Sequence, residues 1–179
     1  QRYCLCAGTV GLRKNHYELI LAWQRFFRSE AYSGEILVIA GGIVPGMNWL
    51  KEFLVKQSLS CGVVYIPCVR DKEVAFLYDN CRFTVYPSLC EGWGLPISES
   101  IHFGKPAVHY NLSSLPEASF GLGNIVQERG AKALGDEIAR LFADGPHYEA
   151  SVRRIAESNL VRYSWGDCTA AVIKAADAL

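Results

Sequence analysis

Residues 3–28 read YCLCAGTVGLRKNHYELILAWQRFFR, and this stretch decides the fold class. It starts with a short apolar run that Gly8 closes, which is the pattern of a buried strand. After a polar loop, apolar residues recur at helical spacing at Leu19, Ala22, Trp23, Phe26 and Phe27. The helix is predicted over residues 15–28, with Asn15 as its cap and Glu18 completing a capping box. A strand, a loop and a helix in this order form the first part of a βαβ unit.

The same alternation of strand and helix continues along the chain. Strands are predicted at residues 3–7, 36–40, 63–66, 82–86, 107–110 and 124–127. Further helices are predicted at 49–55, from Asp71, from Pro96 to Gly104, and at 133–142, 148–160 and 169–179, the last one capped by Ser164 with Asp167. Strands that are apolar throughout fit a parallel sheet that is covered on both faces. We therefore predict one α/β domain over residues 1–179, a doubly wound, Rossmann-like parallel sheet of about six strands with helices at its C-terminal end.

The composition excludes several classes of protein. Half of the 179 residues are hydrophobic, 12% are aromatic and 20% are charged, which excludes a disordered chain. Eighteen basic and eighteen acidic residues give no net charge, so we predict neither nucleic-acid binding nor wholesale binding to an anionic membrane. No apolar run approaches the ~18 residues of a membrane span. The chain begins at Gln1 and is in a strand-like run by Tyr3, so we expect it to be part of a longer protein.

The cysteines and histidines suggest structural roles. The seven cysteines form no C-x-x-C pair, so neither a zinc site nor a disulfide framework is predicted, and we expect mostly buried, reduced thiols in a cytoplasmic protein. His16 is expected at a polar surface position. His102 and His109 are expected in structural positions, because neither has a partner at metal-ligand spacing. We predict no metal site and no cofactor.

The loop over residues 8–16 is the first candidate binding loop, because ligands of open parallel sheets bind after the carboxyl ends of the strands. It combines two glycines with the adjacent cations Arg13 and Lys14, and a helix start follows. Free N–H groups and the helix dipole make such a place favourable for phosphate. The spacing is that of neither a Walker loop nor a dinucleotide fingerprint, so a solvated basic turn is an equal alternative for this loop alone.

The second candidate loop, residues 87–99, reads PSLCEGWGLPISE. Glu91 lies in the loop, and Glu99 is expected on the first turn of the helix that Pro96 opens. The two carboxylates flank a loop-to-helix junction, where both can face one ligand. Gly92 and Gly94 carry no side chain, so the backbone can approach that ligand closely. A tight turn followed by a surface glutamate is the alternative, but the density of glycines, prolines and carboxylates favours a site.

Five features together resemble the retaining glycosyltransferases of the GT-B fold, specifically the large family 4 group. Residues 87–99 match that family's P-S-x-x-E-G-x-G-L-P-x-x-E pattern, an E-x7-E motif, at every fixed position. Residues 8–15 resemble its G-T-x-x-x-R-K-N loop, and residues 70–78 resemble its D-x-E-L-x-x-L-Y helix. Residues 113–117 resemble its S-S-L-P-E turn, and residues 163–165 its aromatic-Ser-Trp sequence before the last helix. The resemblance covers essentially the whole chain, with the motifs in the family's order.

The resemblance implies that the chain is the C-terminal, donor-binding half of a two-domain enzyme, whose N-terminal acceptor-binding domain is absent from it. The enzyme would move a sugar from a GDP- or UDP-linked donor to a glycan or lipid-linked acceptor, with retention and without a metal. The expected setting is bacterial surface-polysaccharide synthesis in the cytoplasm, at the inner face of the membrane, with mannosyl or rhamnosyl transfer favoured. A non-catalytic nucleotide-sugar-binding module and another GT-B enzyme, such as an epimerase, remain alternatives.

The resemblance also implies roles for matching positions. Lys14 corresponds to the lysine that pairs with the donor diphosphate. Thr9 stands where many members have a second phosphate-binding arginine, a charge that Arg13 would supply instead. Glu91 corresponds to the glutamate near the donor sugar and is, with Lys14, expected to be catalytic, while Glu99 corresponds to the acceptor of the ribose hydroxyls. The remaining expected donor contacts are Gly92, Trp93, Gly94, Leu95 and, for the base, the backbone of residues 66–69.

Overall fold

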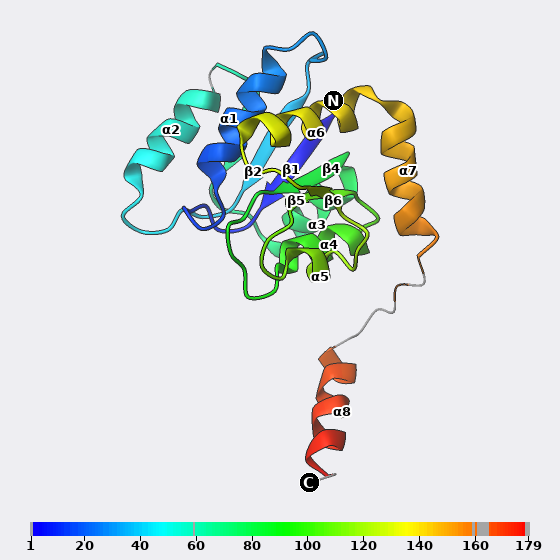
Figure 1. Ribbon diagram of the computed structural model, residues 1–179. Helices are drawn as coiled ribbons and strands as arrows, with labels where there is room; N and C mark the ends of the chain where they lie inside the picture. The colour runs from blue at the N-terminus through cyan, green and yellow to red at the C-terminus, as the bar shows by residue number, and fades with distance from the viewer. Residues whose placement is uncertain (1, 59, 159, 161–164, 178–179) are drawn as a thin grey trace.

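The computed structural model describes residues 2–58, 60–158, 160 and 165–177, and these ranges contain six strands and eight helices (Figure 1). In chain order the elements are β1 (Tyr3–Ala7), α1 (His16–Phe27), β2 (Ile36–Ala40), α2 (Asn48–Ser58), β3 (Val63–Ile66), α3 (Asp71–Asn80), β4 (Phe83–Tyr86), α4 (Leu95–His102), β5 (Ala107–Tyr110), α5 (Leu115–Ala118), β6 (Asn124–Val126), α6 (Ala131–Ala143), α7 (Gly145–Ala156) and α8 (Trp165–Ala176). All strand pairs are parallel. The predicted fold class and all six predicted strands are confirmed.

The strand order in the sheet is β3-β2-β1-β4-β5-β6, so the chain starts at the middle of the sheet. It first adds β2 and β3 on one side and then crosses back to add β4, β5 and β6 on the other. Tyr3 pairs with Ile36 across β1 and β2, whereas Cys4 pairs with Phe83 across β1 and β4. The direction of winding therefore reverses between β1 and β4, which is the position where open α/β sheets bind their ligands.

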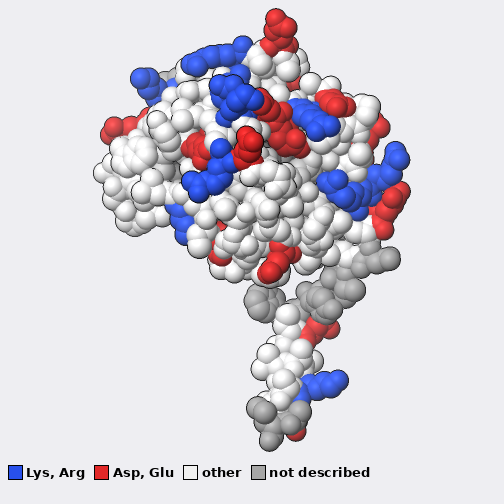
Figure 2. All heavy atoms as spheres, viewed as in Figure 1, with Lys and Arg blue, Asp and Glu red and all other residues white. Residues whose placement is uncertain are grey.

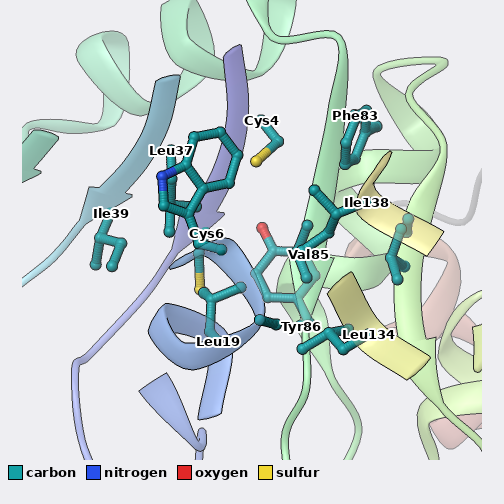
Figure 3. Close-up of a cluster of buried hydrophobic side chains, with 14 of the residues drawn as sticks. Cys4, Cys6, Leu19, Leu37, Ile39, Phe83, Val85, Tyr86, Leu134 and Ile138 are labelled. Atoms are coloured by element: carbon teal, nitrogen blue, oxygen red, sulfur yellow. The ribbon is translucent and has the colours of Figure 1, made fainter. Parts of the chain in front are cut away.

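Side chains alternate across β1, so its two faces contribute to different parts of the core. Cys4 and Cys6 point into the larger buried cluster. Figure 3 shows this cluster with Leu19 of α1, Leu37 and Ile39 of β2, Phe83, Val85 and Tyr86 of β4, and Leu134 and Ile138 of α6. Leu5 and Ala7 point to the opposite side and pack with Tyr78 of α3. Helices cover both faces, which explains why the strands are apolar throughout.

Several predicted helix starts are corrected by the structure. Asn15 makes no side-chain cap of α1: its backbone is left-handed (φ 57°), and its side-chain oxygen accepts no hydrogen bond from a helix N–H. Its amide instead donates to the Glu18 carboxylate. Asp71 is the first residue of α3 rather than its cap, and the Glu73 carboxylate accepts from the Arg70 N–H at 2.8 Å. Left-handed backbone is tolerated by asparagine more readily than by most residues, which is why the sequence could not separate the two roles.

The C-terminal helices also begin earlier than predicted. α7 begins at Gly145, three residues before the predicted start, because Asp144 caps it by accepting from the His147 N–H at 3.0 Å. α8 begins at Trp165 rather than at residue 169. The predicted cap Ser164 lies outside the described residues. The short helix α5 was hidden in the S-S-L-P-E turn and was not predicted.

The expectation of a surface position for His16 is wrong. His16 is fully buried, with Nε2 3.6 Å from Sγ of Cys6 and Nδ1 3.4 Å from the backbone nitrogen of Gly11. Burial is the main cause that lowers the pKa of His16 to about 4, so the imidazole is neutral at physiological pH. His109 is buried too, with Nδ1 2.9 Å from the Tyr110 carbonyl oxygen, and its structural position is confirmed.

Four of the seven cysteines are buried, and charged side chains of both signs lie on the surface. Cys4, Cys6, Cys61 and Cys81 are buried, whereas Cys68, Cys90 and Cys168 are exposed. On the face shown in Figure 2, basic and acidic side chains are interspersed, and neither sign covers a continuous area. Along the described ranges, no helix combines the length and the apolar character needed to cross a bilayer.

Candidate functional site

A cleft of about 930 Å³ opens at the carboxyl ends of the central strands, beside the point where the winding reverses. Five segments line it: the loops after β1, β2 and β3, the first turn of α3, and the start of α4. Of the donor contacts expected from the sequence, the lining includes Thr9, Arg13, Lys14, Leu95 and Glu99, together with residues 67–69 of the expected base contact. The first candidate loop and the end of the second, which are about eighty positions apart in the chain, therefore form one cavity.

Two glycines allow the loops after β1 and β2 to touch at the floor of the cleft. A Cβ on Gly41 would lie 2.2 Å from the Gly8 carbonyl oxygen, and the Gly41 backbone has φ +147°. A Cβ on Gly8, at φ +121°, would lie 3.3 Å from Nζ of Lys14. Side chains at these two positions would collide with backbone or with the cation, so glycine is required at Gly41 and favoured at Gly8.

The carboxylate of Glu91 is the meeting point of both cations of the first loop. Nζ of Lys14 lies 3.3 Å from Oε1 of Glu91, and the guanidinium of Arg13 pairs with Oε2. Arg13 also donates to the Cys90 carbonyl oxygen at 2.7 Å. Side-chain exposure is 14% for Lys14 and 10% for Glu91 but 55% for Arg13, so the Lys14–Glu91 pair is the shielded part of the cluster.

The surroundings of Glu91 keep it ionised. Partial burial raises its pKa, but the hydrogen bond from Arg13, the charge of Lys14 and the hydrogen bond from Ser88 together hold the pKa below its ordinary value. The Ser88 hydroxyl donates to Oε1 at 3.0 Å. Glu91 and Gly94 line a narrow gap next to the cleft, and Lys14 and Pro96 border both spaces.

Two serines that received no role in the sequence analysis hold the backbone of the Glu91 loop. The Ser113 hydroxyl donates to the Glu91 carbonyl oxygen at 2.8 Å, and the Ser114 hydroxyl donates to the carbonyl oxygens of Glu91 at 3.1 Å and Trp93 at 2.7 Å. Ser113 itself has a left-handed backbone (φ 51°). The available signal was the pair of adjacent hydroxyls directly after β5.

Glu99 lies on the second turn of α4, because the helix begins at Leu95 and not at Pro96. It is exposed to the cleft. The buried Tyr78 of α3 donates its hydroxyl hydrogen to Oε2 of Glu99 at 2.9 Å. Tyr78 was recognised in the sequence only as a member of a helix pattern, and its hydrophobic ring gave no sign that its hydroxyl meets Glu99.

Of the other predicted donor contacts, some line the cleft and others do not. Leu95 and Thr9 line the cleft, whereas Gly92, Trp93 and Gly94 do not. Trp93 is half-exposed, and its indole N–H donates to the Ser98 hydroxyl at 3.0 Å. Gly94 has φ +106°, and a Cβ there would lie 3.2 Å from Cβ of Ala118, so this glycine serves the loop-to-helix turn. At Gly92, by contrast, an added Cβ would meet open space.

The loop after β3 forms the far wall of the cleft. Pro67, Cys68 and Val69 line it, together with Val74 of α3. The hydroxyl of Tyr65, on β3, donates to the Gly41 carbonyl oxygen at 3.1 Å, which ties this wall to the floor. This wall is mostly apolar and lies away from Lys14 across the sheet order, since β3 is the outer strand on that side. A flat, uncharged group fits such a wall.

The fold is that of an α/β protein with a Rossmann-like parallel sheet, and its cleft lies at the switch point of the sheet. Comparison with known proteins agrees: residues 1–158 match the family described as glycosyl transferases group 1. Since this match covers most of the chain, the chain belongs to the glycosyl transferases group 1 family. Its fold is that of a GT-B glycosyltransferase domain.

Individual relatives give the same picture. The O-antigen chain mannosyltransferase B of Escherichia coli is 32% identical over 178 residues, which cover 98% of this chain and 45% of that protein. This chain therefore spans less than half the length of that relative. The catalytic domain of cholesterol-α-glucosyltransferase from Helicobacter pylori has a TM-score of 0.69 at 20% identity, covering 87% of this chain and 95% of that one. HepE from Anabaena, solved with UDP and glucose, has a TM-score of 0.67 at 14% identity, covering 87% and 42%.

Proposed function

We propose that this chain is the donor-binding domain of a glycosyltransferase that moves a sugar from a nucleoside-diphosphate sugar to an acceptor. The observation that carries this proposal is that Lys14 and Glu99, from two distant segments, line one cleft at the switch point of the sheet. A cation suits a diphosphate, and a carboxylate suits a pair of ribose hydroxyls. A nucleoside diphosphate has both groups, separated by a few bonds, whereas a simple anion has only the first.

The relatives support the choice of donor and setting. One is an O-antigen mannosyltransferase, and one fold neighbour was solved with UDP and glucose. We propose a GDP- or UDP-linked sugar as the donor, mannose as the first sugar to test, and surface-polysaccharide synthesis in the bacterial cytoplasm as the setting. This chain spans 45% of the length of the O-antigen mannosyltransferase, and we place the acceptor-binding half in the part that it does not span. The chain alone is therefore expected to bind nucleotide and to transfer no sugar.

The side chains suggest how the transfer proceeds. Lys14, assisted by Arg13, neutralises the charge that develops on the departing nucleoside diphosphate, which is electrostatic stabilisation of the transition state and requires no metal. Thr9 and the backbone at Gly92 complete the diphosphate and sugar contacts. Glu91 positions the sugar and stabilises positive charge at its reacting carbon, and the acceptor attacks from the face that the diphosphate leaves. The product then retains the configuration of the donor.

The test is calorimetric titration of the 179-residue chain with GDP, UDP, GMP and UMP. A diphosphate should bind more tightly than its monophosphate, and Lys14→Ala should weaken the diphosphate by about 1.5–3 kcal/mol, the scale of a hydrogen bond to a charged group. Lys132→Ala is the matched control, because Lys132 is exposed on α6, pairs with Asp136 and does not line the cleft. Equal affinity of wild type and Lys14→Ala would remove Lys14 from the site.

The mechanism needs the full-length protein. The anomeric configuration of the product, read by NMR, should equal that of the donor sugar. Turnover should be unchanged when EDTA is present. An inverted product would contradict the retaining mechanism without affecting the binding proposal.

A further inference from the structure

Tyr78 connects the core of the protein to the edge of the cleft. It lies near the C-terminal end of α3, and its side chain is 1% exposed. Its ring stacks on Phe103 with centroids 5.1 Å apart and planes 12° from parallel, and it packs beside Leu5 of β1. These contacts fix the ring, so the hydroxyl has a defined position below the start of α4.

The Tyr78 hydroxyl has three oxygen neighbours but only one proton to donate. Oε2 of Glu99 and the Tyr86 hydroxyl both lie at 2.9 Å, and the Pro96 carbonyl oxygen lies at 3.2 Å. Burial, reinforced by Tyr86 and Glu99, raises the pKa of Tyr78 well above its ordinary value, so the phenol keeps its proton. A carboxylate is the strongest acceptor of the three, and the buried Tyr86 can donate its own proton to Tyr78. The consistent arrangement is a chain of donation from Tyr86 to Tyr78 to Glu99.

This chain of hydroxyls restrains a side chain that would otherwise be mobile. Glu99 is exposed on a helix surface, where a glutamate samples several rotamers and loses entropy when a ligand fixes it. With Oε2 held by Tyr78, the carboxylate keeps one orientation toward the cleft. Glu99 lines the cleft, and in the described part of the chain no hydrogen bond to its Oε1 is seen, so this oxygen is available to a ligand.

We propose that Tyr78 is the positioning residue for Glu99, and that it pre-orients this carboxylate to accept the hydroxyls of a nucleotide ribose. The inference rests on the proposed function, because it takes Glu99 to be the ribose contact. Tyr78 itself is enclosed by protein and acts only through Glu99. Preorganisation of this kind increases affinity by removing part of the ordering cost that the ligand would otherwise meet.

The test compares ribose with deoxyribose, because a merely structural role would affect both equally. Affinities for UDP, GDP and their 3′-deoxy counterparts are measured by calorimetry on the 179-residue chain, and the ratio of deoxy to ribo Kd is formed for each variant. Tyr78→Phe keeps the ring and its stacking on Phe103 and removes only the hydroxyl. Tyr3→Phe is the matched control, because the Tyr3 hydroxyl donates to the Leu77 carbonyl oxygen of the same helix at 2.7 Å and has no contact with Glu99.

We expect Tyr78→Phe to weaken ribonucleotide binding roughly five- to tenfold, the effect of about one ordinary hydrogen bond, with little change for the deoxynucleotides. The ratio should fall in Tyr78→Phe and in Glu99→Ala, fall no further in the double variant, and stay at the wild-type value in Tyr3→Phe. A lower ratio in Glu99→Ala with an unchanged ratio in Tyr78→Phe overturns the inference alone. An unchanged ratio in Glu99→Ala overturns the ribose contact itself, and the inference with it.

Discussion

Nζ of Lys14 lies 3.3 Å from Oε1 of Glu91, so the two residues expected to act in catalysis form an ion pair with each other. Sequence reasoning assigned one to the diphosphate and the other to the sugar, without a contact between them. Since Arg13 pairs with the second oxygen of the same carboxylate, a donor diphosphate that binds Lys14 would share this cation cluster with Glu91. The ion pair therefore places the diphosphate and the reacting sugar carbon next to each other in the proposed mechanism.

The two glutamates should differ in what they bind. Glu99→Gln should weaken the bare nucleoside diphosphate by about 1–2 kcal/mol, because a carboxylate that accepts from a diol is replaced by a neutral amide. Glu91→Gln should bind it as tightly as wild type or more tightly, because Lys14 and Arg13 lose the carboxylate that competes for them. Calorimetric titration of both variants with GDP and UDP provides the comparison.

In the full-length protein, Glu91→Gln should lower turnover even though it leaves nucleotide affinity intact, because it removes a group that acts near the reacting carbon. The two substitutions are chemically identical, so each variant is the control for the other. If Glu91→Gln loses the bare nucleotide as severely as Glu99→Gln does, the division of labour between the two glutamates is wrong.

Buried His16 should make the folded chain sensitive to mild acid. Its pKa of about 4 lies below the ordinary value of 6.5, so between these values the unfolded chain binds a proton that the folded chain does not. The free energy of unfolding therefore has its full contribution from His16 above pH 6.5. It decreases by about 3 kcal/mol as the pH falls from 6.5 to 4. Urea unfolding at several pH values should show this loss in wild type and not in His16→Gln.

The partly exposed His102 offers the control, as His102→Gln removes an imidazole from α4 without touching the core around Cys6. The stability difference between wild type and His16→Gln should narrow as pH falls from 6.5 to 4. A difference that is constant over this range would mean that His16 does not resist protonation.

Replacing Gly41 by alanine should destabilise the fold, whereas replacing Gly92 should have almost no effect on stability. Gly41→Ala places a Cβ 2.2 Å from the Gly8 carbonyl oxygen at a backbone angle that alanine avoids, and should cost about 3 kcal/mol or more. Gly92→Ala meets open space and should change stability by less than about 0.5 kcal/mol. Thermal unfolding of both variants measures the contrast, and a stable Gly41→Ala would show that the loops after β1 and β2 can separate.

The serine pair after β5 should control the rigidity of the Glu91 loop. Ser114→Ala removes the hydroxyl that donates to the carbonyl oxygens of Glu91 and Trp93, and should destabilise the chain by about 1 kcal/mol. Amide hydrogen exchange should accelerate in residues 89–94 and stay unchanged in β1. Ser60→Ala, which removes a surface hydroxyl bonded to the Lys56 carbonyl oxygen, should leave this loop as it is. Unchanged exchange in Ser114→Ala would contradict the restraint.

Local patterns predicted the strands well, because an apolar run of four or five residues between glycines and prolines has few other uses in a folded chain. The burial of His16 could also have been predicted from these patterns. His16 lies three and four positions before Leu19 and Ile20, which puts it on the buried face of α1 by helical spacing alone. Its polar side chain led to the wrong expectation.

Contacts between distant segments could not be predicted in this way. Arg13 and Glu91 are 78 positions apart, and Tyr78 and Glu99 lie on different helices. No periodicity or spacing relates such pairs, because they meet only once the sheet order is set. The sequence therefore indicated which residues belong to the site, while the pairing of Lys14 with Glu91 and the support by Ser113, Ser114 and Tyr78 required the fold.

The contact between Gly8 and Gly41 has a consequence for engineering. Because the backbones of the loops after β1 and β2 touch at the floor of the cleft, neither loop has room to change its course alone. Attempts to alter donor choice by transplanting a single loop from a relative would bring in a backbone shaped for a different neighbour. Exchanging both loops as one cassette, together with the two strands that carry them, preserves the fit between them.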